Sequence, residues 1–261
     1  MKKFLALVLC VVMVVSMAAC GKKASSDSEL ASIKAKGKLV VGITNFEPMD
    51  YMDENGNWIG FDADLAVAFA KSLGVDVEFV EIDWDNKVME LNGNTVDCIW
   101  NGMTLTDEVT SAMDCSKPYC NNAQIVVLPK DVADQYPDVT SLSTLQFAVE
   151  AGSAGAAEAE ANGFSYTEVS SQANALMEVA AGTSDAAVID SLMAAAMVGE
   201  GTSYADLTYT IGLNNEEYGV GFRKGSDLVE ELNKFFKASY DDGSMMETAK
   251  KYGVQAAVIE Q

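Results

Sequence analysis

The residues best suited to chemistry in this chain stand directly after apolar segments. The segment IWNGMTLTDEV places Asn101, Gly102 and Thr104 at the end of such a run, with an amide, a bare backbone and a hydroxyl. The segment EAGSAG begins at Glu150 and is rich in glycine. A helix is expected to start there, and the free backbone N–H groups at its start would favour an anion. Asp190 ends a third apolar run. Together these groups could bind and orient a small polar solute.

The composition excludes several classes of function. The chain has no histidine and one arginine, Arg223, so the common hydrolytic triads are absent. No set of Cys, Asp or Glu has the spacing of metal ligands, and we expect no catalytic residue, cofactor or metal. A net charge of −22 argues against nucleic acid as a partner. It indicates either a solvated acidic surface or a field that attracts cationic solutes.

Alternating strands and helices must position these groups, which favours an α/β fold with parallel sheet. Asp62 is expected to cap a helix that ends at Gly74. The apolar periodicity predicts strands over 39–43, 75–82, 96–100, 145–149 and 186–189. It predicts helices over 62–73, 87–92 and 174–181. A further helix is expected to start at 156, and two more are expected near the end of the chain.

Two segments, ELNGNTVDCIWN and EVAAGTSDAAVID, are built alike. Each has a helix end, a glycine turn, an aspartate, an apolar strand and a polar residue at the strand's carboxyl end. Ligands of open α/β sheets bind at that end, although any βα unit can look this way. Two extended segments, Gln124 to Lys130 and Tyr218 to Phe222, fit a chain that leaves one lobe and later returns to it.

The N-terminal segment is typical of an exported protein. A positive start is followed by FLALVLCVVMVVSMAA, which is too short for a comfortable membrane span. The sequence SMAAC-G resembles the lipobox of bacterial lipoproteins, which implies a signal peptide over 1–20 and lipidation of Cys20; a plain signal peptide is the alternative. Residues 21–35 are predicted to form a flexible tether.

The other mature cysteines, Cys98, Cys115 and Cys120, are odd in number and do not form a disulfide framework. Cys115 and Cys120 could pair outside the cell, but nothing in their spacing requires it, and free thiols are the preferred interpretation.

The mature sequence resembles the polar amino-acid-binding proteins of bacterial ABC importers, the extracellular solute-binding proteins of family 3. The similar segments, in chain order, are FEPMDY, GFDADLAVAFAKSLGVDVEFVEIDWDNKVMELN, VDCIWNGMTLT, SKPY, EAGSAG, DAAVID and YGVGFRKG. The resemblance implies a two-lobed α/β fold of the periplasmic-binding-protein type II, which closes about two hinge strands. It places lobe 1 at 36–123 and 219–261, lobe 2 at 128–214, and the hinge strands at 124–127 and 215–218.

The resemblance also implies a set of ligand-binding residues. Aromatic rings would stack on the ligand, a loop at 101–104 and the junction near 153 would hold its carboxylate, and Asp190 would pair with its α-ammonium. Asp190 could also cap the next helix. The predicted residues are Phe46, Trp84, Asn101, Gly102, Met103, Thr104, Glu150, Ser153, Ala154, Asp190 and Tyr218.

Two positions depart from the family pattern. The arginine that usually grips the ligand carboxylate is replaced by Val109, and Arg223 lies beyond the hinge and cannot easily substitute. Glu150 stands where a neutral or basic residue is common. Two ligands therefore remain open. The first is an α-amino acid held by backbone N–H groups and Thr104. The second is a cationic amine or a modified amino acid, attracted by Glu150, Asp190, Asp83 or Asp85, that needs no free carboxylate.

The resemblance implies capture of a small amino acid or amine and its delivery to an ABC transporter permease. The protein would be a monomer outside the cytoplasm, held to the cell membrane only through the lipid. The alternatives are a receptor module for a separate membrane sensor, or an extracytoplasmic dehydratase on the same fold. A chain without histidine and with one arginine is poorly equipped for the dehydratase.

Overall fold

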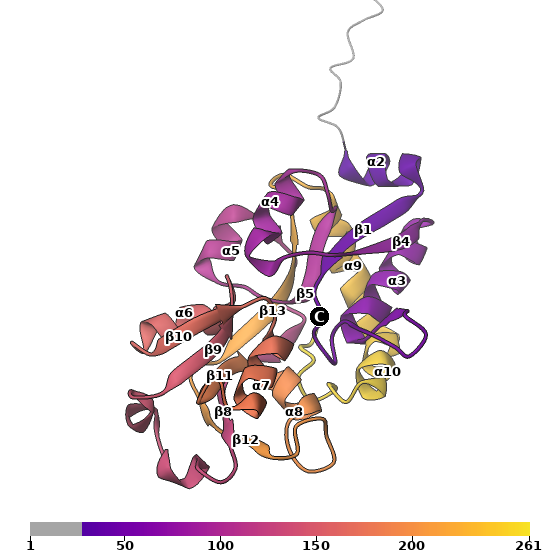
Figure 1. The fold of residues 1–261 in the computed structure, drawn as a ribbon. Helices are drawn as coiled ribbons and strands as arrows, with labels where there is room; N and C mark the ends of the chain where they lie inside the picture. The colour runs from indigo at the N-terminus through magenta and orange to yellow at the C-terminus, as the bar shows by residue number, and fades with distance from the viewer. Residues whose placement is uncertain (1–27) are drawn as a thin grey trace, which may run out of the picture.

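The computed structural model describes residues 28–261, which form two α/β lobes, each built around one sheet (Figure 1). The predicted α/β fold with two lobes is confirmed. The predicted signal peptide and Cys20 lie outside the described residues. No helix within the described part of the chain has the length and apolar composition needed to cross a bilayer.

Lobe 1 contains a sheet of order β4-β1-β5-β13-β6, with β7 also pairing with β13. Its strands are β1 (Lys38–Ile43), β4 (Asp76–Glu81), β5 (Cys98–Thr104), β6 (Asp114–Cys115), β7 (Cys120–Asn122) and β13 (Glu216–Phe222). Strands β2 (Tyr51–Met52) and β3 (Trp58–Ile59) form a separate two-stranded hairpin. The helices of lobe 1 are α2 (Glu29–Lys36), α3 (Phe61–Leu73), η1 (Trp84–Asn86), α4 (Lys87–Asn92), α5 (Asp107–Ala112), α9 (Leu228–Asp241) and α10 (Ser244–Lys251).

Lobe 2 contains a sheet of order β10-β9-β11-β8-β12. Its strands are β8 (Gln124–Pro129), β9 (Gln146–Glu150), β10 (Ser165–Val169), β11 (Ala186–Asp190) and β12 (Leu207–Gly212). Its helices are η2 (Ala133–Gln135), η3 (Val139–Leu142), α6 (Ala154–Ala161), α7 (Gln172–Ala181) and α8 (Ser191–Met197).

The pairing is parallel where strands and helices alternate and antiparallel where the chain crosses between lobes. Strands β4, β1 and β5 are parallel, as are β10, β9 and β11, whereas β13 and β8 run antiparallel to their neighbours. The carboxyl ends of β5, β9 and β11 therefore carry Thr104, Glu150 and Asp190.

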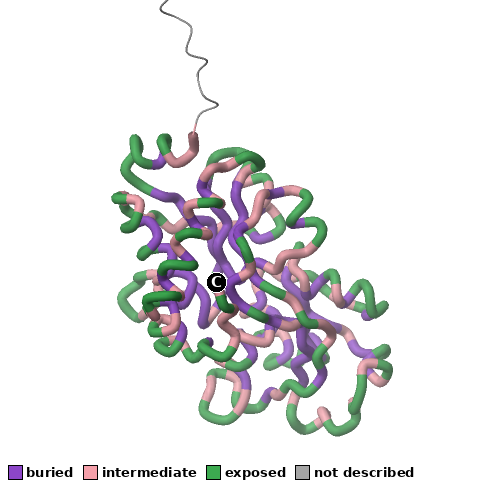
Figure 2. Tube along the Cα trace, turned by 180° about the vertical axis from the view of Figure 1, so that it is seen from behind, coloured by how far each residue is buried: buried purple, intermediate pink, exposed green. Residues whose placement is uncertain are grey.

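Apolar strands and helix faces bury the interior of each lobe. In Figure 2 the buried residues gather in the interior of the molecule, while the exposed ones lie on its outer turns. In lobe 1, Phe69 of α3 and Phe236 of α9 pack on Trp100 of β5, with ring centroids 6.2 and 5.5 Å away. Burial of each such side chain contributes about 1.5–3 kcal/mol, so this packing fixes β5 in the sheet.

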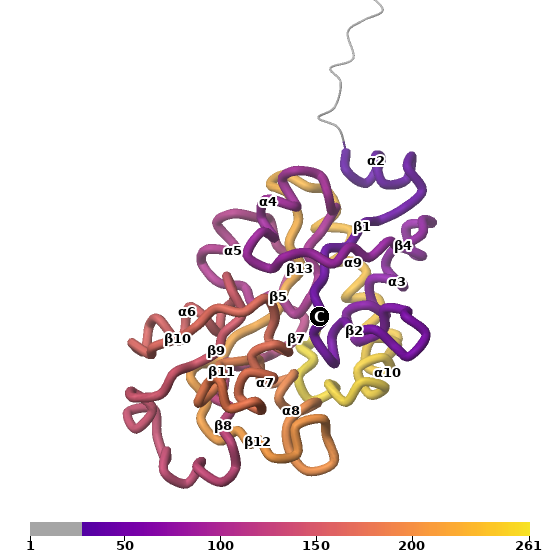
Figure 3. Tube along the Cα trace, viewed as in Figure 1, coloured from indigo at the N-terminus to yellow at the C-terminus, as the bar shows by residue number. Residues whose placement is uncertain are grey.

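The two crossings lie side by side. The chain passes from β7 into β8 and returns from β12 into β13, as the trace in Figure 3 shows. The backbone N–H of Leu213 donates to the Gln124 carbonyl at 2.8 Å, and the Gln124 N–H donates to Asn214 Oδ1 at 2.7 Å. The predicted hinge segments 124–127 and 215–218 fall mostly within β8 and β13, so the crossings come just before each.

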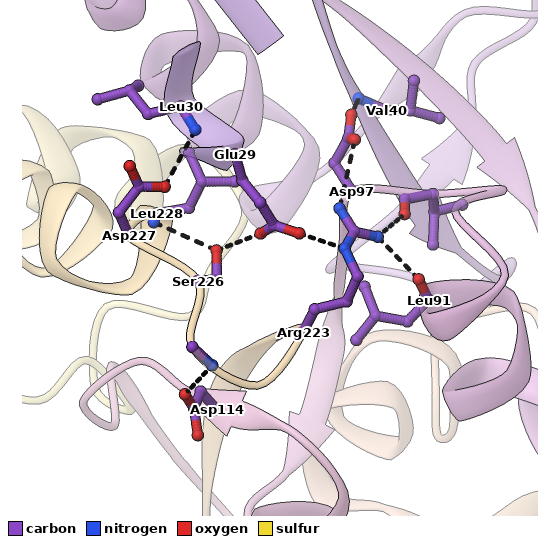
Figure 4. Close-up of polar contacts among 12 residues, drawn as sticks. Glu29, Leu30, Val40, Leu91, Asp97, Asp114, Arg223, Ser226, Asp227 and Leu228 are labelled. Atoms are coloured by element: carbon purple, nitrogen blue, oxygen red, sulfur yellow. Dashed lines mark hydrogen bonds and ion pairs between the residues drawn. The ribbon is translucent and has the colours of Figure 1, made fainter. Parts of the chain in front are cut away.

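The prediction of a flexible tether over 21–35 is wrong for its second half. Residues from Glu29 onward form α2, which packs on lobe 1 through buried Ile33. Glu29 accepts a charged hydrogen bond from Arg223, and the Leu30 N–H donates to Asp227 Oδ1 at 3.0 Å (Figure 4). These contacts, together with the Ser28 cap, fix a segment whose composition alone looked unstructured.

The three cysteines in the described residues are free thiols. Cys98 and Cys120 are buried and Cys115 is half-buried, in agreement with the preferred interpretation.

Candidate functional site

A cavity of about 250 Å³ lies between the two lobes, with lining residues from both. It is lined by every predicted site residue except Tyr218, and also by Val109. From lobe 1 these are Phe46, Trp84 and the end of β5, and from lobe 2 they are Glu150, the start of α6 and Asp190. The structure thus brings together residues far apart in the sequence. Their contact with a ligand stays a prediction.

Tyr218 does not reach the cavity. It is fully buried in β13, opposite Thr104, and its ring meets the edge of Phe46 with centroids 6.3 Å apart. The structure therefore places Tyr218 behind the cavity wall, not at the edge of the cleft. The pairing of β13 with β5 turns its side chain toward the core of lobe 1.

The aromatic residues of the cavity also belong to the core. Phe46 and Trp84 are buried, and Trp84 packs with Met103 and Val109 in an apolar cluster. The Lys87 ammonium lies 5.0 Å from the centroid of the Trp84 ring. Such a ring face can accept an alkyl stem or a cation, so core packing and ligand stacking are compatible here.

The end of β5 differs from the predicted loop. Residues 101–104 are in the strand, and their polar groups already have partners within the protein. The Gly102 N–H donates to Asp62 Oδ2 at 2.7 Å, and the Thr104 hydroxyl donates to Glu216 Oε1 at 2.7 Å. Asn101 exchanges hydrogen bonds with Thr44. The Gly102 and Thr104 donors assigned to a ligand carboxylate are therefore occupied in this form.

Asp62 does not cap α3, which corrects the prediction. It lies inside the first turn, fully buried, and accepts from both Gly102 and the Tyr119 hydroxyl, the latter at 2.7 Å. Burial raises the pKa of Asp62 to about 7, although these hydrogen bonds act in the opposite direction. The carboxylate supports the cavity wall from behind.

Asp190 is surrounded by amide donors. Asn122 and Gln172 donate to its carboxylate at 2.6 and 2.5 Å, and Gln124 donates as well. Asp190 occupies the N-cap position of α8 but its side chain makes no capping bond. Burial raises its pKa to about 7, and the charge of Glu216 acts in the same direction. The result is a fixed acceptor group at the cavity wall.

Glu150 is the second buried carboxylate of the cavity. It is 3% exposed, and its Oε1 has no hydrogen-bond partner. Burial raises its pKa to about 8, the charge of Asp190 adds to this, and Lys87 opposes it. A buried acceptor without a partner costs on the order of 1–3 kcal/mol, so the group is poised to accept a donor.

The start of α6 supplies the opposite polarity. Ser153 caps the helix, its Oγ accepting from the Ala156 N–H at 3.1 Å, and both Ser153 and Ala154 line the cavity. The first N–H groups of a helix carry a positive partial charge of roughly half a unit. An anionic group of a ligand would be stabilised there.

The sequence analysis missed Lys87 and Gln172, which also line the cavity. Lys87, on α4 of lobe 1, donates to the Gly152 carbonyl of lobe 2 at 2.8 Å and so bridges the lobes. Burial lowers the pKa of Lys87, and neighbouring acids oppose that shift. A lysine directly after the acidic DWDN segment was an available signal. Gln172 gave none, because only the fold brings α7 to Asp190.

The missing arginine has no substitute in Arg223. Val109 is buried against the cavity, whereas the Arg223 guanidinium donates to the carbonyls of Leu91 and Val96, each at 2.7 Å (Figure 4). Among the described residues that line the cavity, Lys87 is the one cation. No group of metal-ligating side chains occurs in residues 28–261. The arrangement can bind a small charged solute.

Comparisons with known proteins identify the family of the chain. Residues 39–255 match the model of the bacterial extracellular solute-binding proteins, family 3. The arginine-binding extracellular protein ArtP of Bacillus subtilis (strain 168) is 30% identical over 261 residues, covering 97% of this chain and 98% of ArtP.

Solved structures show the same two-lobed architecture. An ABC uptake transporter substrate-binding protein from Streptococcus pneumoniae with bound histidine has a TM-score of 0.81 at 29% identity, covering 89% of this chain and 99% of that one. An ancestral amino acid-binding protein, described as a precursor of cyclohexadienyl dehydratase, has a TM-score of 0.79 at 32% identity, covering 86% and 99%.

Proposed function

Since the chain belongs to the bacterial extracellular solute-binding proteins of family 3, we propose that it captures an α-amino acid between its lobes and delivers it to an ABC importer. ArtP is named for arginine and the Streptococcus pneumoniae structure holds histidine, which supports amino acids as a class without choosing one. The role is binding, not catalysis.

One observation carries the proposal. The cavity places the amide-held carboxylate of Asp190 and the N-terminus of α6 on the walls of one small space. An α-amino acid carries an ammonium and a carboxylate, which match these two groups. Lys87 adds a cation for the carboxylate in place of the arginine that Val109 replaces.

A carboxylate-free amine is the second candidate ligand. The Gly102 and Thr104 donors are already occupied, and two buried carboxylates, Glu150 and Asp190, line the cavity. Both observations would suit a polyamine.

Differential scanning fluorimetry with the amino acids and a set of polyamines tests the proposal. A ligand at about 100 times its Kd stabilises the folded state by roughly 2.7 kcal/mol, which raises the Tm by several degrees. We expect such a rise with at least one α-amino acid. A rise with polyamines alone would replace the first ligand by the second, and no rise with either would contradict the proposed function.

Asp190→Asn is the matching variant. It removes the negative charge while keeping size and shape, so we expect amino-acid affinity to fall by at least roughly tenfold. Asp76→Asn, on the exposed start of β4, is the control and should bind as the unchanged protein does. Equal affinities for the two variants would rule out Asp190 as the ammonium partner.

The proposed cellular location of the protein rests on its family and on its N-terminal segment. Membership supports a place outside the cytoplasm. We propose that Cys20 carries a lipid that holds the monomeric protein at the membrane beside its permease. Labelling of cells with a palmitate analogue should mark the protein, and Cys20→Ala should abolish the label.

A further inference from the structure

Glu150 has a place in the cavity that recognition of a simple α-amino acid does not explain. It stands at the carboxyl end of β9, just before the turn that leads into α6, and is 3% exposed. Its Oε1 atom lies buried without a hydrogen-bond partner. Buried polar atoms in folded proteins are nearly always hydrogen-bonded. Because Glu150 lines the cavity, a donor group on a bound molecule would supply the missing partner of Oε1.

The buried charges of the cavity are unequal. Among the described residues that line it, Glu150 and Asp190 are buried acids and Lys87 is the one buried base. The α-ammonium of an amino acid would neutralise Asp190, and its carboxylate would neutralise Lys87. Ionised Glu150 is then left without a partner, and a buried unpaired charge is strongly unfavourable. Glu150 therefore stays protonated unless the ligand brings a second cation.

We propose that Glu150 selects the side chain of the ligand by pairing with a second cation, so that the ligand is a basic amino acid bearing an ammonium or guanidinium group. Such a ligand, with two positive groups and one negative, mirrors the two buried acids and one buried base of the cavity. A charge-assisted pair formed out of water is among the strongest polar contacts available. The inference rests on the proposed function and names its substrate class.

Binding of a cation at Glu150 also predicts release of a proton. The charged groups that face Glu150 are Asp190 on β11, Asp83 before η1 and Lys87 on α4. Burial and the two acids raise the pKa of Glu150 to about 8, while Lys87 acts against them. Without a bound cation, the Glu150 carboxyl is therefore mostly protonated at pH 7. A cation bound beside it lowers its pKa. Affinity should rise as the pH rises from 6 to 8.

Isothermal titration calorimetry with two matched ligand pairs tests the selection. L-Arginine and L-citrulline have similar shapes, and L-lysine and L-norleucine share most of their side-chain atoms. Only the first member of each pair has a cationic side chain. We expect the cationic member of at least one pair to bind on the order of 10- to 100-fold more tightly. Titration at pH 7 in buffers of different ionisation enthalpy should show release of a proton with the cationic ligand.

Glu150→Gln is the decisive variant, because it removes the charge and keeps the size. It should abolish the proton release and the preference for the cationic member, so that the two members of a pair bind within about threefold of each other. Glu168→Gln is the control, because it changes the net charge by the same amount. Glu168 is exposed on the neighbouring strand β10. It should behave as the unchanged protein.

The outcomes separate the two proposals. Tight binding of citrulline or norleucine at the expense of its cationic partner would overturn the role of Glu150 and leave amino-acid capture intact. Equal loss of both members in Glu150→Gln would overturn it as well. Absence of binding by every amino acid would instead remove the proposed function on which the inference rests.

Discussion

Gly102 shows how closely single residues fit around the cavity. Its backbone has φ 52°, in the left-handed region, and its N–H is held by Asp62. A Cβ at this position would lie 2.5 Å from Cε1 of Phe46 and 3.1 Å from Cε2 of Tyr218. Glycine is therefore required both by the backbone conformation and by the two rings.

Gly102→Ala should lower both stability and ligand affinity. The left-handed backbone costs about 1 kcal/mol for a residue with a Cβ, and the contact with Phe46 should raise the total to roughly 3 kcal/mol. Gly163→Ala is the control, because Gly163 has φ 70° and nothing within 4 Å of its Cβ position. Urea denaturation should show a larger loss for Gly102. Equal losses would mean that the Phe46 ring moves aside without cost.

At the scale of secondary structure, α6 and α7 are a matched pair of helices in lobe 2. Each is capped by a serine, Ser153 or Ser171, whose hydroxyl accepts a backbone N–H at 3.1 Å. Ser153 lines the cavity, whereas Ser171 does not. The two caps therefore separate the stability of a helix from its contribution to binding.

Ser153→Ala and Ser171→Ala should each destabilise the protein by about 1 kcal/mol, the usual cost of a lost N-cap. Only Ser153→Ala should weaken amino-acid binding, by roughly fivefold, since it alters the helix start that faces the cavity. Thermal melts and calorimetry on both variants give the comparison. A similar loss of affinity in Ser171→Ala would show that the effect is carried by the stability of lobe 2.

The sequence was informative where signals are local. The helix predicted over 87–92 matches α4, and the predicted strand at 39–43 lies within β1, because apolar periodicity and turn residues mark their ends. Residues 101–104 were expected in a loop because their polar composition masks the pairing of β5 with β13, more than 100 residues later. The same limit hid Gln172 and misplaced Tyr218, since the positions of both depend on tertiary packing.

For the molecule as a whole, the chief electrostatic feature is acid buried inside an already acidic protein. The chain has a net charge of −22 and no histidine. Burial is the largest cause of a raised pKa at each of four carboxyls, Asp50, Asp62, Glu150 and Asp190. The folded state therefore holds protons that the unfolded chain releases near pH 4.

This arrangement predicts that the unliganded protein is more stable in mild acid. A carboxyl whose pKa is higher in the folded state loses its stabilising effect as pH rises from about 4 to the folded pKa, here about 7 to 8 for three of the groups. Each can contribute up to about 1.4 kcal/mol per pH unit. Because the chain has no histidine, no histidine titration changes the free energy of unfolding in this pH range.

Thermal denaturation between pH 8 and pH 5 checks the sign. We expect the Tm to rise by at least ~2 °C on acidification, and Asp190→Asn to show a shallower dependence than Asp76→Asn. A Tm that falls steadily from pH 8 to pH 5 would contradict the assignment of these buried acids.

The contacts of α2 attach the N-terminal end of the described residues to lobe 1. Ser28, Glu29 and Leu30 are bonded to Arg223, Ser226 and Asp227 of lobe 1, at the end of the molecule remote from β8 and β12 (Figures 1 and 4). A molecule held through its N-terminus would thus be held by lobe 1, with lobe 2 at the free end. Lobe 2 alone would swing, and a membrane partner would sense a loaded molecule by the new position of that outer half.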